Sequence, residues 1–346
     1  MSVENSGRRA TSMDVANESG VSQATVTRVF SSPELVAPKT QAKVHAAAAR
    51  LGYVPNAIAR SLKSQRTNMI GAVVPAEGEY WQHALTAFSR QLAAQDRQLL
   101  LFSFGEDDRV EQVLESVLQY QLDGVVLASA KISQAQLSVM QAQRVPTVAF
   151  NQPEAAGVVP SISVDNEAGT RALAAHLVED GCRSALFIGG IATTSTDRLR
   201  YQGAARGLGE HGIGCAYLEA GSFSYEAGYF IAEEVVALLA EGGSIGAGRA
   251  RPSALMVSGD ELAFGVLDGL RSRGVRVPDD VLLTGFDGLP QASWAGYDLT
   301  TIVQDIDLLV QRAVEILLDQ EDRTVVPELV ADGALRIGST TRRSRG

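Results

Sequence analysis

The sequence predicts an all-α helix-turn-helix head followed by an α/β core of two doubly wound parallel-sheet lobes. Three observations favour this fold class. Helix starts and stops recur at short intervals in the first fifty residues, strand and helix patterns alternate from Asn68 onward, and the sign of the net charge reverses between these two parts. A chain of 346 residues also has the length of two or three domains.

The first two predicted helices begin at serines, which are favoured helix caps. Ser12 is expected to cap a helix that ends at Gly20, and Ser22 is expected to cap a second helix that runs to about Phe30. These short helices with a glycine between them predict a compact helical unit at the start of the chain.

A third helix is predicted over residues 39–51. Ala16, Gly20 and Val26 have the spacing of a helix-turn-helix, with a small residue where helices cross, a glycine in the turn and an apolar plug in the second helix. A three-helix bundle without a DNA role would have the same pattern, so this alternative stays open here.

The charge distribution favours a polyanionic partner for the head. Residues 1–66 contain nine Lys/Arg and four Asp/Glu, or about +5, which leaves 21 basic and 36 acidic groups, or −15, in the other 280 residues. A basic head on an acidic body is expected when only the head meets nucleic acid. A solvated basic tail would produce the same asymmetry.

Eight apolar runs in the core are predicted as strands, and they are separated by amphipathic helices. The runs are residues 69–74, 99–104, 124–129, 146–150, 185–189, 215–220, 254–259 and 281–286. Continuous apolar runs are typical of parallel strands covered on both faces. They fall into two groups of four with a break near Ser163–Asp165, which predicts two similar lobes and a ligand cleft at the carboxyl ends of the strands.

Several protein classes are disfavoured by what the sequence lacks. No dinucleotide, phosphate-loop, serine-hydrolase or zinc-protease motif is present, so neither an enzyme nor a metal or cofactor is expected. No apolar run is long enough to span a membrane, and the N-terminus has no secretory pattern. With only Cys182 and Cys215, at no metal or redox spacing, the expected location is the cytoplasm.

A set of motifs in fixed order resembles the lactose-repressor (LacI/GalR-type) family of bacterial transcription regulators. The motifs are Asp14-Val15-Ala16, Gly20-Val21-Ser22, Thr25–Val29, Leu51–Asn56, Ala59–Leu62, Val164–Gly169, Gly285-Phe286-Asp287 and Leu299–Ile302. The resemblance implies a sequence-specific DNA-binding regulator, a repressor whose operator affinity a small-molecule effector controls. A two-lobed solute-binding protein without a DNA role, or a Rossmann-like enzyme, would be the competing functions.

The resemblance also implies the domain boundaries. Residues 1–54 would form the head, 55–67 the hinge helix and linker, 68–340 a core like a periplasmic binding protein, and 341–346 a tail. The lobes would comprise residues 68–163 with 304–325, and residues 164–303 with 326–340.

Two groups of residues in the head are expected to contact DNA. In the second helix, Gln23, Ala24, Thr27 and Arg28 match the face that the family presents to base edges in the major groove, whereas Ser22 and Thr25 are expected at phosphates. In the hinge, Asn56 would cap a helix whose Ala59 and Leu62 face the minor groove, where the leucine would wedge between bases or pack in the dimer.

The effector would contact six residues of the core, by alignment with the family. They are Trp81, Gln82, Asn151, Arg200, Phe223 and Asp287. A structural ion pair is the alternative for Arg200, helix capping or a salt bridge for Asp287, and core packing for the two aromatic residues.

Three departures from the family make the effector's identity open. Gly259-Asp260 replaces the usual Asn-Asp, and Asp260 is expected to cap the next helix; Asn151 stands where many members have Asp; and residues 76–82 differ from the common front loop. A sugar or sugar derivative is the first expectation, followed by nucleosides, polyols and small organic acids.

The expected partners are a second copy of the chain, in a homodimer, and double-stranded pseudo-palindromic operator DNA. The sequence STTRRSRG has no apolar heptads for a tetramer.

Overall fold

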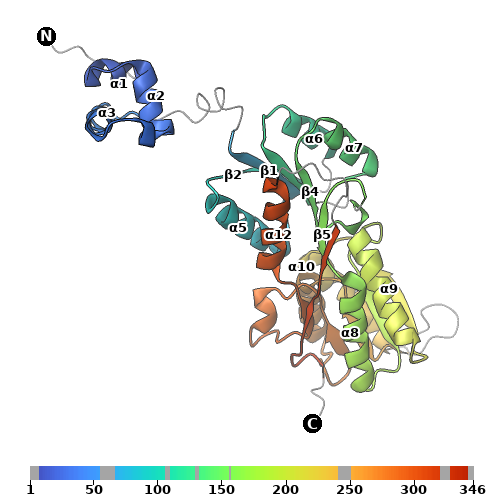
Figure 1. The fold of residues 1–346 in the computed structure, drawn as a ribbon. Coiled ribbons are helices and arrows are strands. Elements are labelled where there is room, and N and C mark those ends of the chain that lie inside the picture. The colour runs from blue at the N-terminus through green and yellow to red at the C-terminus, as the bar shows by residue number, and fades with distance from the viewer. Residues whose placement is uncertain are drawn as a thin grey trace. The chain divides into compact units, whose positions relative to one another are not determined.

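The computed structural model divides into two compact units, residues 1–68 and residues 69–346 (Figure 1). The residues described by the structure are 8–54, 67–105, 110–128, 132–155, 157–240, 251–319 and 328–341. The predicted hinge helix with Asn56, Ala59 and Leu62 lies outside them, as does the predicted tail beyond residue 341.

Within residues 8–54, the head consists of three α-helices and one short 3-10 turn, so the predicted all-α head is confirmed. They are α1 (Ser12–Ser19), α2 (Gln23–Ser31), η1 (Pro33–Leu35) and α3 (Pro38–Leu51). Val15, Val26 and Val44 are fully buried where the three α-helices meet. Gly20 ends α1 in the left-handed conformation with φ 68°, which glycine adopts without steric cost, and the chain can therefore turn sharply into α2.

The cap of α1 was predicted one residue too late. Thr11, not Ser12, is the N-cap: its hydroxyl accepts the backbone N–H of Asp14, and the Asp14 carboxylate accepts the backbone N–H of Thr11 in return. This reciprocal capping box satisfies two N–H groups that the first turn leaves unpaired, which a serine at position 12 alone would not do. The hydroxyl of Ser12, the first helical residue, is therefore available for another contact.

The first lobe of the core is built on a six-stranded parallel sheet with the order β11-β5-β4-β3-β1-β2. The strands are β1 (Met69–Pro75), β2 (Gln98–Phe104), β3 (Gly124–Leu127), β4 (Thr147–Phe150), β5 (Ser161–Val164) and β11 (Glu328–Ala331). On one face lie α5 (Glu79–Ala93) and α12 (Ile306–Leu318), and on the other α6 (Val110–Leu118) and α7 (Gln134–Ala142).

The second lobe has a four-stranded parallel sheet with the order β7-β6-β8-β9. Its strands are β6 (Ala185–Gly189), β7 (Cys215–Glu219), β8 (Ala254–Val257) and β9 (Leu282–Thr284). Two helix pairs cover the sheet, α8 (Asn166–Glu179) with α9 (Ser195–Gly209) and α10 (Tyr225–Ala240) with α11 (Asp260–Ser272). A separate antiparallel pair joins β10 (Thr301–Val303) to β12 (Ala334–Arg336).

The eight predicted strands are present, but the grouping into four and four is wrong for the first lobe. Its sheet also includes β5 and β11, and β5 lies where the break between groups was expected. The sequence of β5, Ser-Ile-Ser-Val, alternates polar and apolar residues and so lacks the continuous apolar run of the other strands. Because β11 pairs with β5, the first lobe continues to Ala331 and does not end at residue 325 as predicted.

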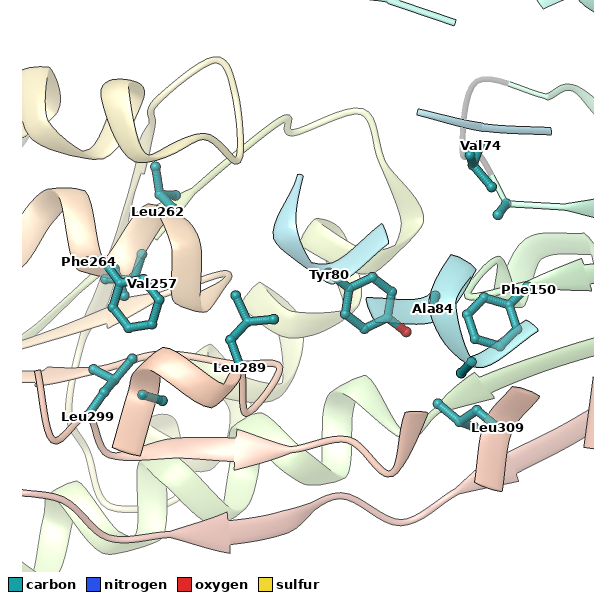
Figure 2. Close-up of a cluster of buried hydrophobic side chains, with 14 of the residues drawn as sticks. Val74, Tyr80, Ala84, Phe150, Val257, Leu262, Phe264, Leu289, Leu299 and Leu309 are labelled. Carbon is teal, nitrogen blue, oxygen red and sulfur yellow. The ribbon is translucent and has the colours of Figure 1, made fainter. Parts of the chain in front are cut away.

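A single cluster of buried apolar side chains extends through both lobes (Figure 2). It includes Phe88 and Phe150 from the first lobe and Val257 and Phe264 from the second. Figure 2 shows Tyr80, at the start of α5, between these two groups of side chains. The lobes are therefore in apolar contact in this structure, and residues at their boundary are withdrawn from solvent.

Candidate DNA-reading surface and effector site

The residues expected at DNA bases lie on the outer face of α2. Gln23, Ala24 and Arg28 are exposed, and Thr27 is half-buried, while Val26 and Val29 on the opposite side are buried in the head. This division follows from helical periodicity, because residues three or four apart share a face. A compact apolar core thus presents one polar helix face to an external partner.

Two further polar residues organise the beginning of α2. The hydroxyl of Ser22 accepts the backbone N–H of Thr25 at 3.1 Å and lies 2.9 Å from the Thr25 hydroxyl. Both residues therefore define the helix start, where free backbone N–H groups favour a negatively charged partner. This position is compatible with the expected contact to phosphate.

Arg28 differs in its ion pairing from Arg8 and Arg50, two other arginines of the head. Arg8 pairs with Asp14 at 3.2 Å and Arg50 pairs with Glu18 at 3.0 Å, both on the surface. Within residues 8–54, Arg28 forms no such ion pair. Its guanidinium is therefore not neutralised by a neighbouring acid in the described head.

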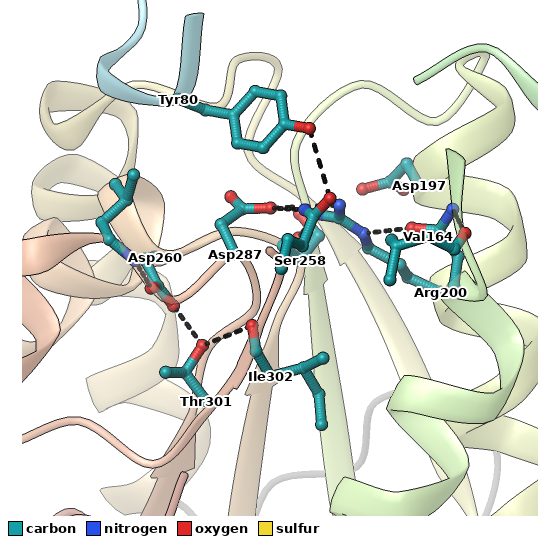
Figure 3. Close-up of polar contacts among 12 residues, drawn as sticks. Tyr80, Val164, Asp197, Arg200, Ser258, Asp260, Asp287, Thr301 and Ile302 are labelled. Atoms are coloured by element: carbon teal, nitrogen blue, oxygen red, sulfur yellow. Dashed lines mark hydrogen bonds and ion pairs between the residues drawn. The ribbon is translucent and has the colours of Figure 1, made fainter. Parts of the chain in front are cut away.

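In the core, Arg200 occupies the centre of a buried polar cluster (Figure 3). Its side chain is 4% exposed, and it extends from α9. Nε donates to the Asn166 carboxamide at 2.8 Å, one terminal nitrogen donates to the backbone carbonyl of Ser258, and the other lies 3.1 Å from an Asp287 carboxylate oxygen. The guanidinium also stacks 3.9 Å above the centre of the Phe286 ring.

Asp287 connects Arg200 to the first lobe. The same oxygen of Asp287 accepts a hydrogen bond from the Gln304 side-chain amide at 2.7 Å, and the Gln304 carbonyl accepts from the Tyr80 hydroxyl at 3.2 Å. Burial, followed by the nearby Asp287 charge, raises the pKa of Tyr80, so the phenol is a neutral donor. A continuous chain of polar contacts therefore runs from α5 to α9 through the segment where the chain crosses between lobes.

The backbone of Asp287 is strained, with φ 119°. Non-glycine residues rarely adopt such values, and they cluster at functional sites where surrounding contacts hold them. Here the backbone N–H of Asp287 bonds to Ile302, and the Asp287 carbonyl accepts from Gln304. Burial raises the pKa of the Asp287 carboxyl, whereas the positive charge of Arg200 opposes this increase.

Asp260 does not cap α11 as predicted. Gly259 is the N-cap, and no side chain caps this helix. The fully buried Asp260 carboxylate instead accepts the Thr301 hydroxyl at 2.6 Å and the Leu289 backbone N–H at 2.8 Å. It ties the loop after β9 to the start of β10. Burial, followed by the Asp287 charge, raises its pKa well above the ordinary value.

Phe223 lies close to this cluster. A Cβ added to Gly259 would come within 3.2 Å of the Asp287 carboxylate and 3.8 Å of the Phe223 ring, so the absent side chain leaves room for both. Phe223 also packs tightly against Gly190, at the end of β6. Arg200, Asp287 and Phe223 are therefore brought together in the second lobe.

The other three expected effector residues belong to the first lobe. Trp81 is half-buried and packs edge-on against Tyr80, with ring centres 5.0 Å apart. Asn151 follows β4 with φ 54°, and its buried carbonyl oxygen has no hydrogen-bond partner among the described residues. Gln82 is exposed and lines an open surface depression with Leu85 and Leu101, apart from the Arg200 cluster.

A second set of contacts joins the lobes beside this cluster. The Glu261 carboxylate, on α11, accepts the backbone N–H of Glu79 at 2.8 Å, and the Gln291 amide donates to the Glu79 carboxylate at 3.1 Å. The second lobe thus supplies the acceptor for the first helical N–H of α5. Burial raises the pKa of Glu261.

Sequence reasoning missed Tyr80, Asn166 and Gln304. Asn166 belongs to the Val164–Gly169 motif, two residues after the end of β5, a position where polar side chains often serve a ligand site. Tyr80 and Gln304 had no such signal, since Tyr80 lies within the departing front loop, residues 76–82, and Gln304 lies in a crossover. Among the described residues, no group of His, Cys, Asp or Glu could hold a metal ion, and no helix is long and apolar enough to cross a membrane.

Comparisons with known proteins agree in both parts of the chain. The family model described as bacterial regulatory proteins, lacI family, matches residues 11–56, and the model of a periplasmic binding protein-like domain matches residues 174–341. The HTH-type transcriptional repressor PurR of Pectobacterium atrosepticum is 31% identical over 347 residues, which cover 94% of this chain and 98% of the relative. Catabolite control protein A of Priestia megaterium is 29% identical over 316 residues, covering 89% and 92%.

A solved structure is similar over both units. It is the lac repressor dimer bound to operator and the anti-inducer ONPF, with a TM-score of 0.85 and 26% identity, covering 97% of this chain and 100% of that one. The likeness includes the helical head as well as the two-lobed core.

Proposed function

We propose, on the premise that this chain belongs to the LacI family of bacterial regulatory proteins, that a small-molecule effector binds at the Arg200–Asp287 pair and thereby controls operator affinity. The protein is a DNA-binding transcriptional repressor with an effector-binding core, and it is not an enzyme. As in the family, it acts in the cytoplasm as a dimer on operator DNA. The competing function of a solute-binding protein without a DNA role is thereby excluded.

One observation carries the placement of the effector site. Arg200 has five N–H donors, and three contacts to acceptors within the described chain leave two for a ligand. A buried guanidinium that is only partly satisfied is costly unless another acceptor meets it. A structural ion pair with Asp287 would explain the pairing but leaves these two donors unused.

Two unpartnered oxygens support the same placement. The Ser258 hydroxyl follows β8 in the second lobe, and the Asn151 carbonyl follows β4 in the first; both are buried without a partner among the described residues. Buried polar atoms are normally hydrogen-bonded, and the carboxyl ends of parallel strands are where such sheets bind ligands. A ligand with several hydroxyl groups could accept hydrogen bonds from the two remaining N–H groups of Arg200 and could also bond to the Ser258 and Asn151 oxygens.

The chemistry of the cluster favours a sugar or sugar derivative. Arg200 and Asp287 can together bond adjacent hydroxyls, and Phe223 and Trp81 offer apolar ring faces. Nucleosides, polyols and small organic acids share parts of this chemistry and are the alternatives. Gln82 lies apart from the cluster and would have to move to take part.

The effector would act through the relation between the lobes. A ligand that contacts both lobes favours one lobe arrangement, and it changes operator affinity only as far as its affinity differs between arrangements. The Tyr80–Gln304–Asp287 chain provides a physical link between the ligand position and the first lobe. The head would then read DNA through Gln23, Ala24, Thr27 and Arg28, with Ser22 and Thr25 at phosphates.

A metabolite thermal-shift screen followed by titration calorimetry tests the site. A sugar that stabilises the wild type at 100 times Kd, by about 2.7 kcal/mol, should leave Arg200→Ala unshifted. Arg206→Ala is the matched control, because Arg206 lies on the same helix and only forms an exposed pair with Glu167 at 2.7 Å. Wild-type affinity in folded Arg200→Ala would show that the site lies elsewhere.

The hinge residues Asn56, Ala59 and Leu62 remain part of the proposal on the basis of the resemblance. Leu62→Ala should weaken specific operator binding and reduce the DNA bend, because a wedged side chain offsets base unstacking with new contacts. Effector binding should be unaffected. A circular-permutation gel shift measures the bend, and an unchanged angle with unchanged affinity would rule out the wedge.

A further inference from the structure

Ser12 and Gln23 occupy equivalent places at the starts of two helices of the head. Each is the first residue of its helix, α1 or α2, and the Gln23 side-chain amide donates to the Ser12 hydroxyl at 2.9 Å. Because Thr11 and Asp14 already form the capping box of α1, the Ser12 hydroxyl is not needed there. It is free to hold a side chain from the neighbouring helix.

The distance between these two residues is fixed by the core of the head. Val15 on α1 and Val26 on α2 are each fully buried and belong to the same apolar cluster. The turn between the helices is also held, since the Val21 backbone N–H bonds to the Ala16 carbonyl at 3.1 Å. Ser12 therefore offers a stationary partner to the longer and more flexible Gln23 side chain.

We infer that Ser12 is a positioning residue for DNA reading, which holds the Gln23 amide in the orientation that it presents to a base pair. The inference rests on the proposed reading of DNA by α2. Glutamine has high side-chain entropy, and an exposed glutamine must lose it when it binds a base edge. A partner within the head removes part of this cost before DNA is met.

Each group retains hydrogen-bonding capacity toward DNA. A carboxamide has two N–H donors and a carbonyl acceptor, so one donor and the acceptor of Gln23 stay available for a base edge. The Thr27 hydroxyl bonds to the Gln23 backbone carbonyl at 3.0 Å and does not compete for the side chain. The geometry therefore lets Ser12 act through Gln23 without displacing it from the groove.

The test is selection from a randomised duplex library with the full-length protein. Gln23→Ala should lower discrimination at one base pair in each half-site by about tenfold or more. Ser12→Ala should lower discrimination at the same base pair by about 2- to 10-fold, the range for freezing one side chain, with nearly unchanged binding to random-sequence DNA. The double variant should resemble Gln23→Ala, because the two residues act as one unit.

Two control variants separate positioning from a structural role. Ser12→Thr retains the hydroxyl and should retain the wild-type preference, while Ser31→Ala removes an exposed serine at the end of α2 and should change nothing. Thermal melting of Ser12→Ala should match the wild type, since an exposed side-chain hydrogen bond adds little stability.

Several results would overturn the inference. Full discrimination in Ser12→Ala, with loss in Gln23→Ala, would remove the role of Ser12 and leave reading by α2 intact. A loss in Ser12→Ala at a different base pair would make Ser12 itself the reader. No sequence preference in the wild type would contradict the proposed DNA function instead.

Discussion

The head and the core use their functional side chains in opposite ways. In the head, the candidate DNA-reading residues Gln23 and Arg28 are exposed, and the apolar core lies entirely behind them. In the core, Arg200 is 4% exposed and is bonded to residues from several separate segments. The polar face of α2 is open to a partner, whereas the Arg200 cluster also contributes contacts between the lobes.

This difference predicts different consequences of substitution. Exposed residues that contact only a partner should alter binding without altering stability. Buried, mutually paired charges should alter both, because removal of one leaves the other unpaired in a low-dielectric environment. The core cluster is therefore suited to coupling ligand binding to the arrangement of the lobes. The exposed face of α2 is suited to binding DNA without a change in the structure of the head.

The largest expected effect belongs to Arg200→Ala. Removal of the guanidinium leaves Asp287 buried without its counter-charge, and the free energy of unfolding should fall by about 3–5 kcal/mol. Arg206→Ala should cost less than about 1 kcal/mol, since its pair with Glu167 is on the surface. Urea denaturation measures both; equal small losses would mean that the core cluster is no more structural than a surface pair.

Asp287→Asn should have a smaller effect, with a loss of roughly 1–3 kcal/mol. The substitution keeps the shape and an acceptor for Arg200, and it removes the charge that raises the pKa of the Asp260 carboxyl. Effector affinity should decrease while the unliganded operator affinity stays near wild type. Calorimetry and a gel shift on the same preparation measure these; unchanged effector affinity would exclude Asp287 from the site.

In the head, Arg28→Ala should change DNA binding by about 1–3 kcal/mol and leave the thermal melting temperature unchanged. Arg28 is exposed and forms no ion pair within the described head, so no neighbour is left unpaired. Relaxed preference at one operator position would identify a base contact, and a uniform loss would identify a phosphate contact. A lower melting temperature would contradict the contrast between the two regions.

The smallest effect is expected from the Glu261 contact to α5, and it depends on pH. Because the folded-state pKa of Glu261 is raised, the folded protein binds more protons than the unfolded chain just above the ordinary glutamate range, and stability falls as pH rises there. Glu261→Gln keeps an acceptor for the Glu79 N–H and should abolish this part of the pH dependence. The difference in melting temperature between wild type and variant, measured across pH 4–7, checks this. A difference that stays constant with pH would show that Glu261 does not contribute to the pH dependence of stability.

Local sequence signals predicted most of the secondary structure. Apolar periodicity and caps located the three α-helices of the head and eight strands of the core, since both depend on residues close in sequence. Some errors were competitions between neighbouring residues for a helix cap, as at Thr11 and Ser12, or concerned strands without a long apolar run, as at β5 and β11. The cap predicted at Asp260 failed for a tertiary reason, because its carboxylate accepts the Thr301 hydroxyl instead. The structure shows the Arg200–Asp287 ion pair that was the alternative to a ligand contact, and the ligand contact itself stays a proposal.

The sequence by itself determined the fold class, the family and the outer face of α2, because these follow from periodicity and from motifs of adjacent residues. Only the tertiary structure decided that Tyr80 reaches Gln304, that Glu261 caps a helix 182 residues away, and that Ser12 holds Gln23. The physical reason is that such contacts depend on how separate elements pack. No local pattern encodes which surfaces of two helices come within hydrogen-bonding distance.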